Sequence, residues 1–308
     1  MDLRQLTALL AVAEHGSFSA AARAIHTVQS NVSTHVARLE KELAVTLVDR
    51  SSGGLTEEGE VAVGRARRIQ AEIDALASDV AALRDEVIGN VRLGMIGSVG
   101  RWLVPDLLDT MTDRHPAVGL VVVDATTTSL LPQLLDGSLD MAVVNLPVPD
   151  PQLGVEPLFE EERILVAPTG HPLASASTLT LAEIAPHGLV LEPEGTAFRD
   201  ELDQTAAALG LELVESAEVD GMTLVASLAF RGHGPAILPT TATLLEPAGD
   251  WVRIPISDLG DRGVGLARRR AGRLPAPSRA VRAVLRELIE RDAPRRDGVR
   301  VTGRSSDG

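Results

Sequence analysis

The chain has 308 residues, a formal net charge of −14 and 44% hydrophobic residues, so it is long and apolar enough to bury the cores of two or three domains. It contains no Cys, no Tyr, two Trp and four Phe, which excludes disulfides, thiolate metal sites and cysteine nucleophiles and argues against base stacking on aromatic rings. The negative charge argues against DNA binding, because affinity for the duplex depends largely on phosphate neutralisation, but residues 1–50 are neutral, with five basic and five acidic residues.

The sequence carries no sign of a membrane segment. A weakly apolar run near the N-terminus is interrupted by Glu14, His15 and Gly16, and it lacks the preceding basic region of a signal peptide. No later apolar run approaches the roughly 20 residues that are needed to span a bilayer. We therefore expect a cytoplasmic protein with no membrane partner.

Three helices are predicted at the N-terminus. The first covers residues 3–14, and its apolar face is made of Leu3, Leu6, Leu9, Leu10 and Ala13. A short second helix follows Ser17 or Ser19, which are both suitable N-cap residues, and it contains the small-residue run 20–24. The third helix begins after Thr27, and its apolar stripe has the helical period of 3.6 residues: Val32, Val36, Leu39 and Leu43.

The third helix has a polar face opposite its apolar stripe. That face and its edges hold amides, hydroxyls and cations, namely Gln29, Ser30, Asn31, Ser33, Thr34, Arg38 and Lys41. Such groups can hydrogen-bond to base edges and phosphates in the major groove of DNA.

The segment 16–50 resembles the N-terminal winged helix-turn-helix of the LysR-type transcriptional regulators. The family motifs stand in order as GSFSAAA at 16–22, VQSNVS at 28–33, and the leucine pattern of 39–43 followed by LVDR at 47–50. Val28 replaces the usual small polar residue, and Val48 replaces the usual Phe. The resemblance implies binding to double-stranded DNA through Ser17, Ser19, Gln29, Ser30, Asn31, Ser33, Thr34, Arg38 and Arg50.

A wing and a long helix are predicted next. Residues 45–50 have the β-branched content of a strand, and the turn cluster 51–54 completes a hairpin that either contacts phosphate or lies on the surface away from DNA. Thr56 is the expected cap of a helix that runs to about residue 87.

The apolar residues of this helix recur every 3.5 residues on average, which is the spacing of a coiled-coil seam. They are Ile69, Ile73, Leu76, Val80, Leu83 and Val87. The seam packs either on the same helix of a second chain or on its own domain. In LysR-type proteins the corresponding helix forms the dimer contact, which implies a homodimer or homotetramer here.

From residue 90 onward, short apolar strands alternate with helical segments, and this predicts an α/β fold with parallel sheets covered by helices. Strands are expected at 91–96, 120–123, 141–144, 164–166, 189–191, 236–238 and 264–267. Helices are expected at 104–114, 129–135, 198–209, 222–229 and 279–291. The segments LDGSLDMA at 135–142 and GHGPAILP at 232–239 are similar to effector-domain signatures of the LysR family. The similarity implies two Rossmann-like subdomains joined by two crossing strands, as in periplasmic solute-binding proteins.

These predictions divide the chain into four parts. They are a winged helix-turn-helix domain at 1–58, a linker and dimerisation helix at 59–89, an effector-binding domain at 90–292 and a disordered tail at 293–308. Within the effector-binding domain, subdomain I comprises about 90–162 and 266–292, and subdomain II about 163–265.

Small polar residues follow several predicted strands and precede helices. In open α/β sheets ligands bind at this edge, where helix N-termini offer amide donors. We expect a small-molecule effector there, and hydroxyls and amides would suit a carboxylate; helix capping is the alternative role for each residue. The candidate effector-binding residues are Ser98, Val99, Thr127, Thr128, Ser129, Asn145, Thr196, Gly221 and Met222.

No catalytic, metal or cofactor site is predicted. Gly94, Gly97 and Gly100 are three residues apart, which matches neither a dinucleotide-binding motif nor a phosphate loop. The segment 97–100 lacks the residue that a G-x-S-x-G nucleophile elbow requires, and the histidines show no ligand spacing. We therefore expect a non-enzymatic protein.

The leading interpretation is a sequence-specific DNA-binding transcriptional regulator controlled by a small-molecule effector. The alternative is a small-molecule receptor whose N-terminal helices only dimerise, and such a receptor would show no salt-dependent binding to its own upstream DNA. The sequence does not specify the effector, the operator, activation or repression, or dimer against tetramer.

Overall fold

The computed structural model describes residues 1–49, 53–244 and 248–302, and these form two compact units. The N-terminal unit contains residues 1–80 with the short segment 135–138, and the C-terminal unit contains the described residues of 81–134 and 139–308. Among the helices that the structure describes, none has the length and apolar character to cross a membrane.

Three helices pack together in the N-terminal unit: α1 (Leu3–His15), α2 (Phe18–Ala24) and α3 (Gln29–Leu43). Ser17 is the N-cap of α2, because its Oγ accepts a hydrogen bond of 3.2 Å from the N–H of Ala20, so Ser19 is not the cap. The helices enclose one apolar cluster that includes Leu9, Val12, Val32, Val36 and Leu39. Leu3 and Leu43 were expected on the buried faces, but both are exposed. Leu3 is the first residue of α1 and Leu43 is the last residue of α3.

The wing is shorter than the predicted strand. It consists of one antiparallel bridge between Val48 and Leu55, and Glu40 of α3 fixes its start by accepting hydrogen bonds from the N–H groups of Leu47 and Val48 at 2.9 and 3.2 Å. A Cβ on Gly59 would lie 2.0 Å from the carbonyl oxygen of Leu47, so only glycine permits this close approach. Residues 50–52, and with them the predicted DNA contact Arg50, lie outside the described part of the chain.

The long helix α4 (Glu57–Ala82) begins as predicted, with Thr56 Oγ1 accepting a hydrogen bond of 3.0 Å from the N–H of Gly59. It ends five residues before the predicted position, because the chain turns after Ala82 and Asp85 adopts a left-handed conformation with φ 61°. Leu83 and Val87, which were predicted as part of the seam, therefore lie beyond the helix.

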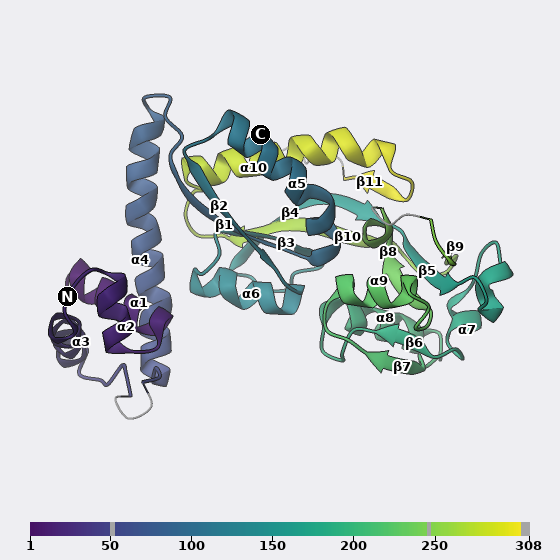
Figure 1. The fold of residues 1–308 in the computed structure, drawn as a ribbon, viewed down its shortest axis with the longest axis horizontal. Helices are drawn as coiled ribbons and strands as arrows, with labels where there is room; N and C mark the ends of the chain where they lie inside the picture. Colours follow the sequence, from purple (N-terminus) through teal and green to yellow (C-terminus); the bar gives the residue numbers. More distant parts are fainter. Residues whose placement is uncertain (50–52, 245–247, 303–308) are drawn as a thin grey trace. The chain divides into compact units, whose positions relative to one another are not determined.

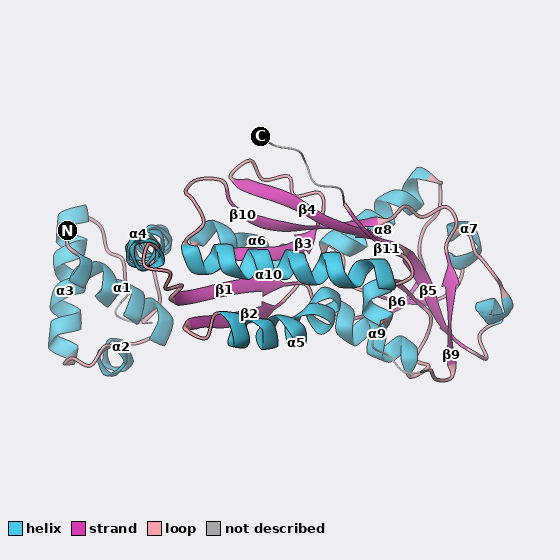
Figure 2. Ribbon diagram, turned by 90° about the horizontal axis from the view of Figure 1, so that it is seen from above, coloured by secondary structure: helices cyan, strands magenta, loops and turns pink. Residues whose placement is uncertain are grey.

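The larger sheet of the C-terminal unit has six strands in the order β11-β4-β10-β3-β1-β2. These strands are β1 (Gly89–Met95), β2 (Val118–Asp124), β3 (Met141–Asn145), β4 (Leu153–Glu161), β10 (Arg262–Arg269) and β11 (Val299–Val301). β1 is parallel to β2 and β3, whereas β10 is antiparallel to β3 and β4. Figure 1 shows α5 (Gly97–Arg114) and α10 (Ala276–Asp292) on one face and α6 (Thr127–Asp136) on the other, and Figure 2 looks onto α5 and α10.

A second lobe holds two small sheets, with strand orders β8-β5-β9 and β6-β7. Its strands are β5 (Arg163–Pro168), β6 (Leu189–Leu191), β7 (Glu215–Glu218), β8 (Ala236–Pro239) and β9 (Trp251–Pro255). Its helices are α7 (Leu181–Ile184), α8 (Ala197–Ala208) and α9 (Met222–Phe230). β6 and β7 are parallel, but β5 is antiparallel to β8 and β9, so the expectation of parallel sheets is wrong for that sheet.

The C-terminal segment after α10 also differs from its prediction. Residues 293–302, which were expected to be disordered, form a short 3₁₀ helix (Ala293–Arg295) and the edge strand β11. Ala293 and Val299 are buried, and β11 pairs with β4, so this segment belongs to the fold. Residues 303–308 lie outside the described part.

Two chain crossings join the lobes. β4 ends in the six-stranded sheet at Glu161 and β5 begins in the second lobe at Arg163, whereas β9 ends at Pro255 and the chain returns at Arg262. Glu161 and Arg262 are register partners on neighbouring strands, so both crossings meet at one place. The two-lobed α/β architecture with two crossing strands is confirmed.

Candidate functional site

The polar face of α3 is accessible to a partner. Gln29, Ser30, Asn31, Thr34 and Arg38 are exposed, and Ser33 is half-buried. Two of these side chains form local hydrogen bonds: Asn31 Nδ2 donates to Thr27 Oγ1 at 3.1 Å, and Thr34 Oγ1 donates to the main-chain oxygen of Ser30 at 2.7 Å. Ser17 and Ser19 are also exposed, although Ser17 uses its oxygen as a helix cap.

The seam residues that lie within α4 present apolar side chains to solvent in the single chain. Ile69, Val80 and Leu76 are exposed, Leu76 by 67%, and Ile73 is half-buried. An apolar stripe of this kind along a helix is typical of a contact with another helix.

A cavity of about 370 Å³ lies in the C-terminal unit, and residues of both lobes line it. It brings together most of the predicted effector-binding residues: Ser98, Thr127, Ser129, Asn145, Thr196, Gly221 and Met222. Two predicted residues do not line it. Val99 is buried in the hydrophobic core, and Thr128 Oγ1 instead spans the lobes, where it donates to the oxygen of Gly195 at 3.5 Å and accepts from the N–H of Ala197 at 3.3 Å.

Three carboxylates also line the cavity, and none of them is among the predicted effector-binding residues. They are Asp124 at the end of β2, Glu192 after β6 and Asp220 before α9. Glu192 is 6% exposed, and this burial raises its pKa to about 7, although Arg262 lowers the pKa of that carboxyl and Asp220 raises it further. Partial burial of its carboxyl also raises the pKa of Asp124, although the residue as a whole is exposed.

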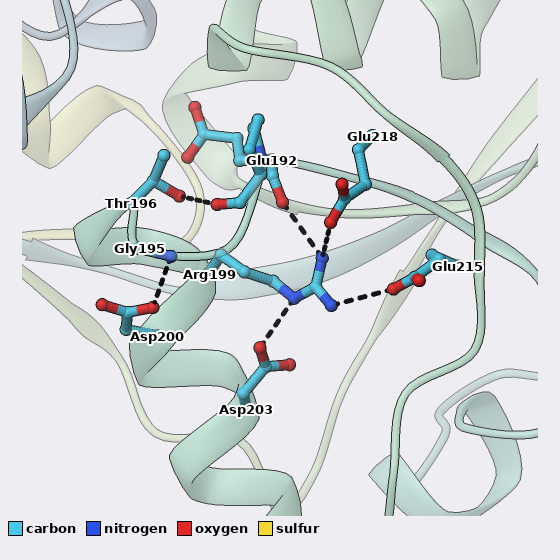
Figure 3. A network of polar contacts seen from close by, with 9 residues as sticks. Glu192, Gly195, Thr196, Arg199, Asp200, Asp203, Glu215 and Glu218 are labelled. Carbon is cyan, nitrogen blue, oxygen red and sulfur yellow. Dashed lines mark hydrogen bonds and ion pairs between the residues drawn. The ribbon is translucent and has the colours of Figure 1, made fainter.

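The backbone of Glu192 is fixed by a network around Arg199 of α8 (Figure 3). The Arg199 guanidinium donates to the main-chain oxygen of Glu192 at 3.1 Å and to the carboxylates of Asp203, Glu215 and Glu218 at 2.7, 3.0 and 3.2 Å. Figure 3 shows the Glu192 carboxylate directed away from Arg199, so the Arg199 network holds the backbone of this residue and not the carboxylate that lines the cavity.

Arg262 anchors the cavity wall at the chain crossings. Its Nε and Nη2 donate to Glu161 Oε1 at 3.0 and 2.5 Å, and Nη2 donates to Ser98 Oγ at 3.0 Å. Glu161 in turn accepts a hydrogen bond of 2.7 Å from the N–H of Thr241. Glu161 is 0% and Arg262 1% exposed, so this is a fully buried ion pair.

Two family models match the chain. The model described as a bacterial regulatory helix-turn-helix protein of the lysR family matches residues 3–60, and the LysR substrate binding domain matches residues 84–290. The chain belongs to the LysR family. This LysR-type regulator therefore joins a DNA-binding winged helix-turn-helix to an effector-binding domain, and it regulates transcription.

Full-length relatives agree with the family. The LysR-type regulator is 33% identical over 300 residues to a probable hydrogen peroxide-inducible genes activator of Streptomyces viridosporus, across 95% of this chain and 96% of that protein. It is 28% identical over 303 residues to the DNA-binding transcriptional dual regulator OxyR of Escherichia coli K12, across 97% of each. A full-length OxyR variant from Pseudomonas aeruginosa has a similar structure, with a TM-score of 0.78 and 25% identity over 99% of each chain.

The charged residues of the cleft were missed for a definite reason. Asp124 is the last residue of β2 and Glu192 directly follows β6, so the rule that placed ligands at strand ends would have selected them as readily as it selected Asn145. The sequence interpretation considered mainly small polar residues at those ends. Arg262 had no such signal, because it begins a strand, and its partner Glu161 is 101 residues away in the sequence.

Proposed function

We propose that this LysR-type regulator places α3 in the major groove of its operator, assembles through the seam on α4, and responds to a small molecule held reversibly in the cleft. The proposed DNA contacts are Ser17, Ser19, Gln29, Ser30, Asn31, Ser33, Thr34, Arg38 and Arg50. The proposed seam in the helix is Ile69, Ile73, Leu76 and Val80. We propose neither catalysis nor a cofactor, and because the target is DNA we expect the protein to act in the cytoplasm.

The observation that carries this proposal is the cavity between the lobes. Both lobes line it, and the buried pair of Glu161 and Arg262 joins it to the two chain crossings. A ligand that binds one arrangement of the lobes more tightly than another shifts the population towards that arrangement. An effector in the cleft can therefore be coupled to operator binding only through such unequal affinity.

The effector of this chain differs in kind from an oxidant that acts on thiols. Two relatives are named for hydrogen peroxide, but the reversible oxidation of a thiolate to a sulfenic acid or disulfide requires cysteine, and this chain has none. The methionine that lines the cavity, Met222, is buried. We therefore propose a non-covalent effector.

Operator binding tests whether the polar face of α3 is the reading face, that is, the surface that contacts the bases and phosphates of DNA. Fluorescence anisotropy with labelled DNA from upstream of the gene should show binding that weakens steeply with salt. Ser30→Ala, Asn31→Ala and Arg38→Ala should each weaken binding by about tenfold or more, because each removes a base or phosphate contact without touching the core.

Arg84→Ala is the matched control, because Arg84 is exposed and lies outside α3. It should leave the affinity unchanged. Unchanged affinity in all three α3 variants would contradict the reading face, and the absence of any salt-dependent binding would favour a receptor whose N-terminal helices only dimerise.

A further inference from the structure

The cleft carries an excess of negative charge. Asp124, Glu192 and Asp220 reach it from three different segments. Arg262 is the one basic residue among the described residues that line it, and Arg262 is already paired with the buried Glu161. Because that pair is neutral as a whole, the three remaining carboxylates determine the charge that a ligand meets.

Helix N-termini normally favour an anionic ligand, but here the chain supplies its own anions at these ends. The Glu192 carboxyl lies near the start of α9, where the N–H of Met222, the first residue of that helix, lowers its pKa. Asp124 Oδ1 lies against the first residue of α5, where a Cβ built on Gly97 would come within 3.0 Å of it. Protein carboxylates therefore occupy the positions that a ligand carboxylate would need.

An unpaired acceptor is buried in the same cavity. Asn145 is 8% exposed, and its backbone is held by a hydrogen bond of 2.9 Å from its N–H to Thr127 Oγ1. Its side-chain Oδ1 accepts no hydrogen bond from the described residues, and the buried Thr223 Oγ1 also has no partner among them. A buried polar atom without a partner is destabilising, so a ligand that donates a hydrogen bond to Asn145 Oδ1 removes that cost.

We propose that the cleft binds a cationic small molecule, with a protonated amine or a guanidinium group whose N–H donors meet Asn145 and the carboxylates of Asp124, Glu192 and Asp220. This inference rests on the proposed function, in which a small molecule binds reversibly in the cleft. The cavity of about 370 Å³ has the size of a site for a small ligand. An anionic ligand would meet the like charges of Asp124 and Asp220, and above about pH 7 that of Glu192 as well, so the carboxylate that the hydroxyl-rich strand ends favoured is a poor fit.

Three four-carbon probes test the sign of the charge: 1,4-diaminobutane, 1,4-butanediol and succinate. Isothermal titration calorimetry of the full-length protein, slightly above neutral pH, should show the diamine binding at least about tenfold more tightly than the diol or succinate, because only the diamine donates charged hydrogen bonds. Equal or tighter binding of succinate or the diol overturns the proposal, and so does a diamine that gives no binding heat.

Carboxamide variants locate the binding. Asp124→Asn and Asp220→Asn alter exposed residues and keep their shape, and each should weaken diamine binding by about tenfold. Glu194→Gln is the matched control, because Glu194 is exposed in the same loop as Glu192 but does not line the cavity. If the control weakens binding as much as the other two variants, the diamine is attracted by general surface charge and the proposal is wrong.

The two proposals fail in different ways. Operator binding is measured on the same preparation without any probe. If the protein binds the diamine but does not bind upstream DNA, the regulatory function is contradicted and the ligand class stands. If the protein binds upstream DNA but binds succinate more tightly than the diamine, the cationic ligand class is contradicted and the regulatory function stands.

Discussion

The reading face of α3 and the cleft of the C-terminal unit use polar side chains in opposite ways. On α3, Asn31, Thr34 and Arg38 are exposed, and the side chains of Asn31 and Thr34 hydrogen-bond to residues four positions away in the chain. In the cleft, Glu192 and Arg262 are buried. Arg262 hydrogen-bonds to Glu161 and Ser98, and the charges of Arg262 and Asp220 act on Glu192, so each residue interacts with distant segments of the chain. Substitutions on the polar face of α3 should therefore change binding alone, whereas substitutions of the buried cleft residues Glu192 and Arg262 should change stability as well.

The largest expected effect is the loss of the buried ion pair. Arg262→Ala leaves the carboxylate of Glu161 buried without its cation, which should lower the free energy of unfolding by about 3–5 kcal/mol. Urea unfolding followed by circular dichroism measures this loss. Arg273→Ala, at an exposed arginine, should change stability by less than about 0.5 kcal/mol, and an equal loss in both variants would contradict the contrast between buried and exposed sites.

A somewhat smaller effect is expected from pH. The pKa of Glu192 is raised by burial from its ordinary value of 4.5 to about 7, so between these values the folded protein holds a proton that the unfolded chain has lost. Stability should then fall as the pH rises from about 4.5 to above 7, in total by an amount on the order of 3 kcal/mol. Glu192→Gln removes this contribution.

The measurement is the unfolding midpoint of the wild type and Glu192→Gln across that pH window. The variant should gain stability relative to the wild type as the pH rises, because Arg262 and Asp220, the charges that face Glu192, are the same in both proteins. Parallel pH curves would show that Glu192 does not titrate as its burial requires.

The smallest effect on stability is expected on the seam. Leu76→Glu changes a side chain that is 67% exposed in the single chain, so the fold should keep its secondary structure and its stability within about 0.5 kcal/mol. Sedimentation should nevertheless show monomers, because a charge now lies in the helix contact. Ala77→Glu, exposed on the same helix outside the seam, should leave the oligomer intact, and an intact oligomer with Leu76→Glu would contradict the seam.

Sequence patterns predicted the elements whose signal is local. The three N-terminal helices and the polar face of α3 follow from apolar spacing and cap residues within fifty consecutive positions. β7 has four exposed residues and therefore no apolar pattern to detect. β11 exists because it pairs with β4, and no local property of a Gly- and Arg-rich tail reveals that partner.

The candidate site divides in the same way. Strand ends and hydroxyl clusters located most of the cavity lining, since the rule for ligand positions in α/β sheets needs only the order of elements. The charge of the cleft was not predicted, because it depends on which of the lining carboxylates form an ion pair with a basic residue. That depends on the pairing of Glu161 with Arg262 across a long stretch of chain.

The buried pair at the chain crossings has a consequence for how such a regulator can evolve. Asp124 and Asp220, which line the cavity, are exposed residues outside the helices, whereas Glu161 and Arg262 are buried where the lobes join. The residues that would set ligand preference are therefore different from the buried ion pair that holds the two chain crossings together. A descendant of this protein can acquire a new effector through single substitutions at the exposed cavity residues and keep the ion pair of Glu161 and Arg262 unchanged.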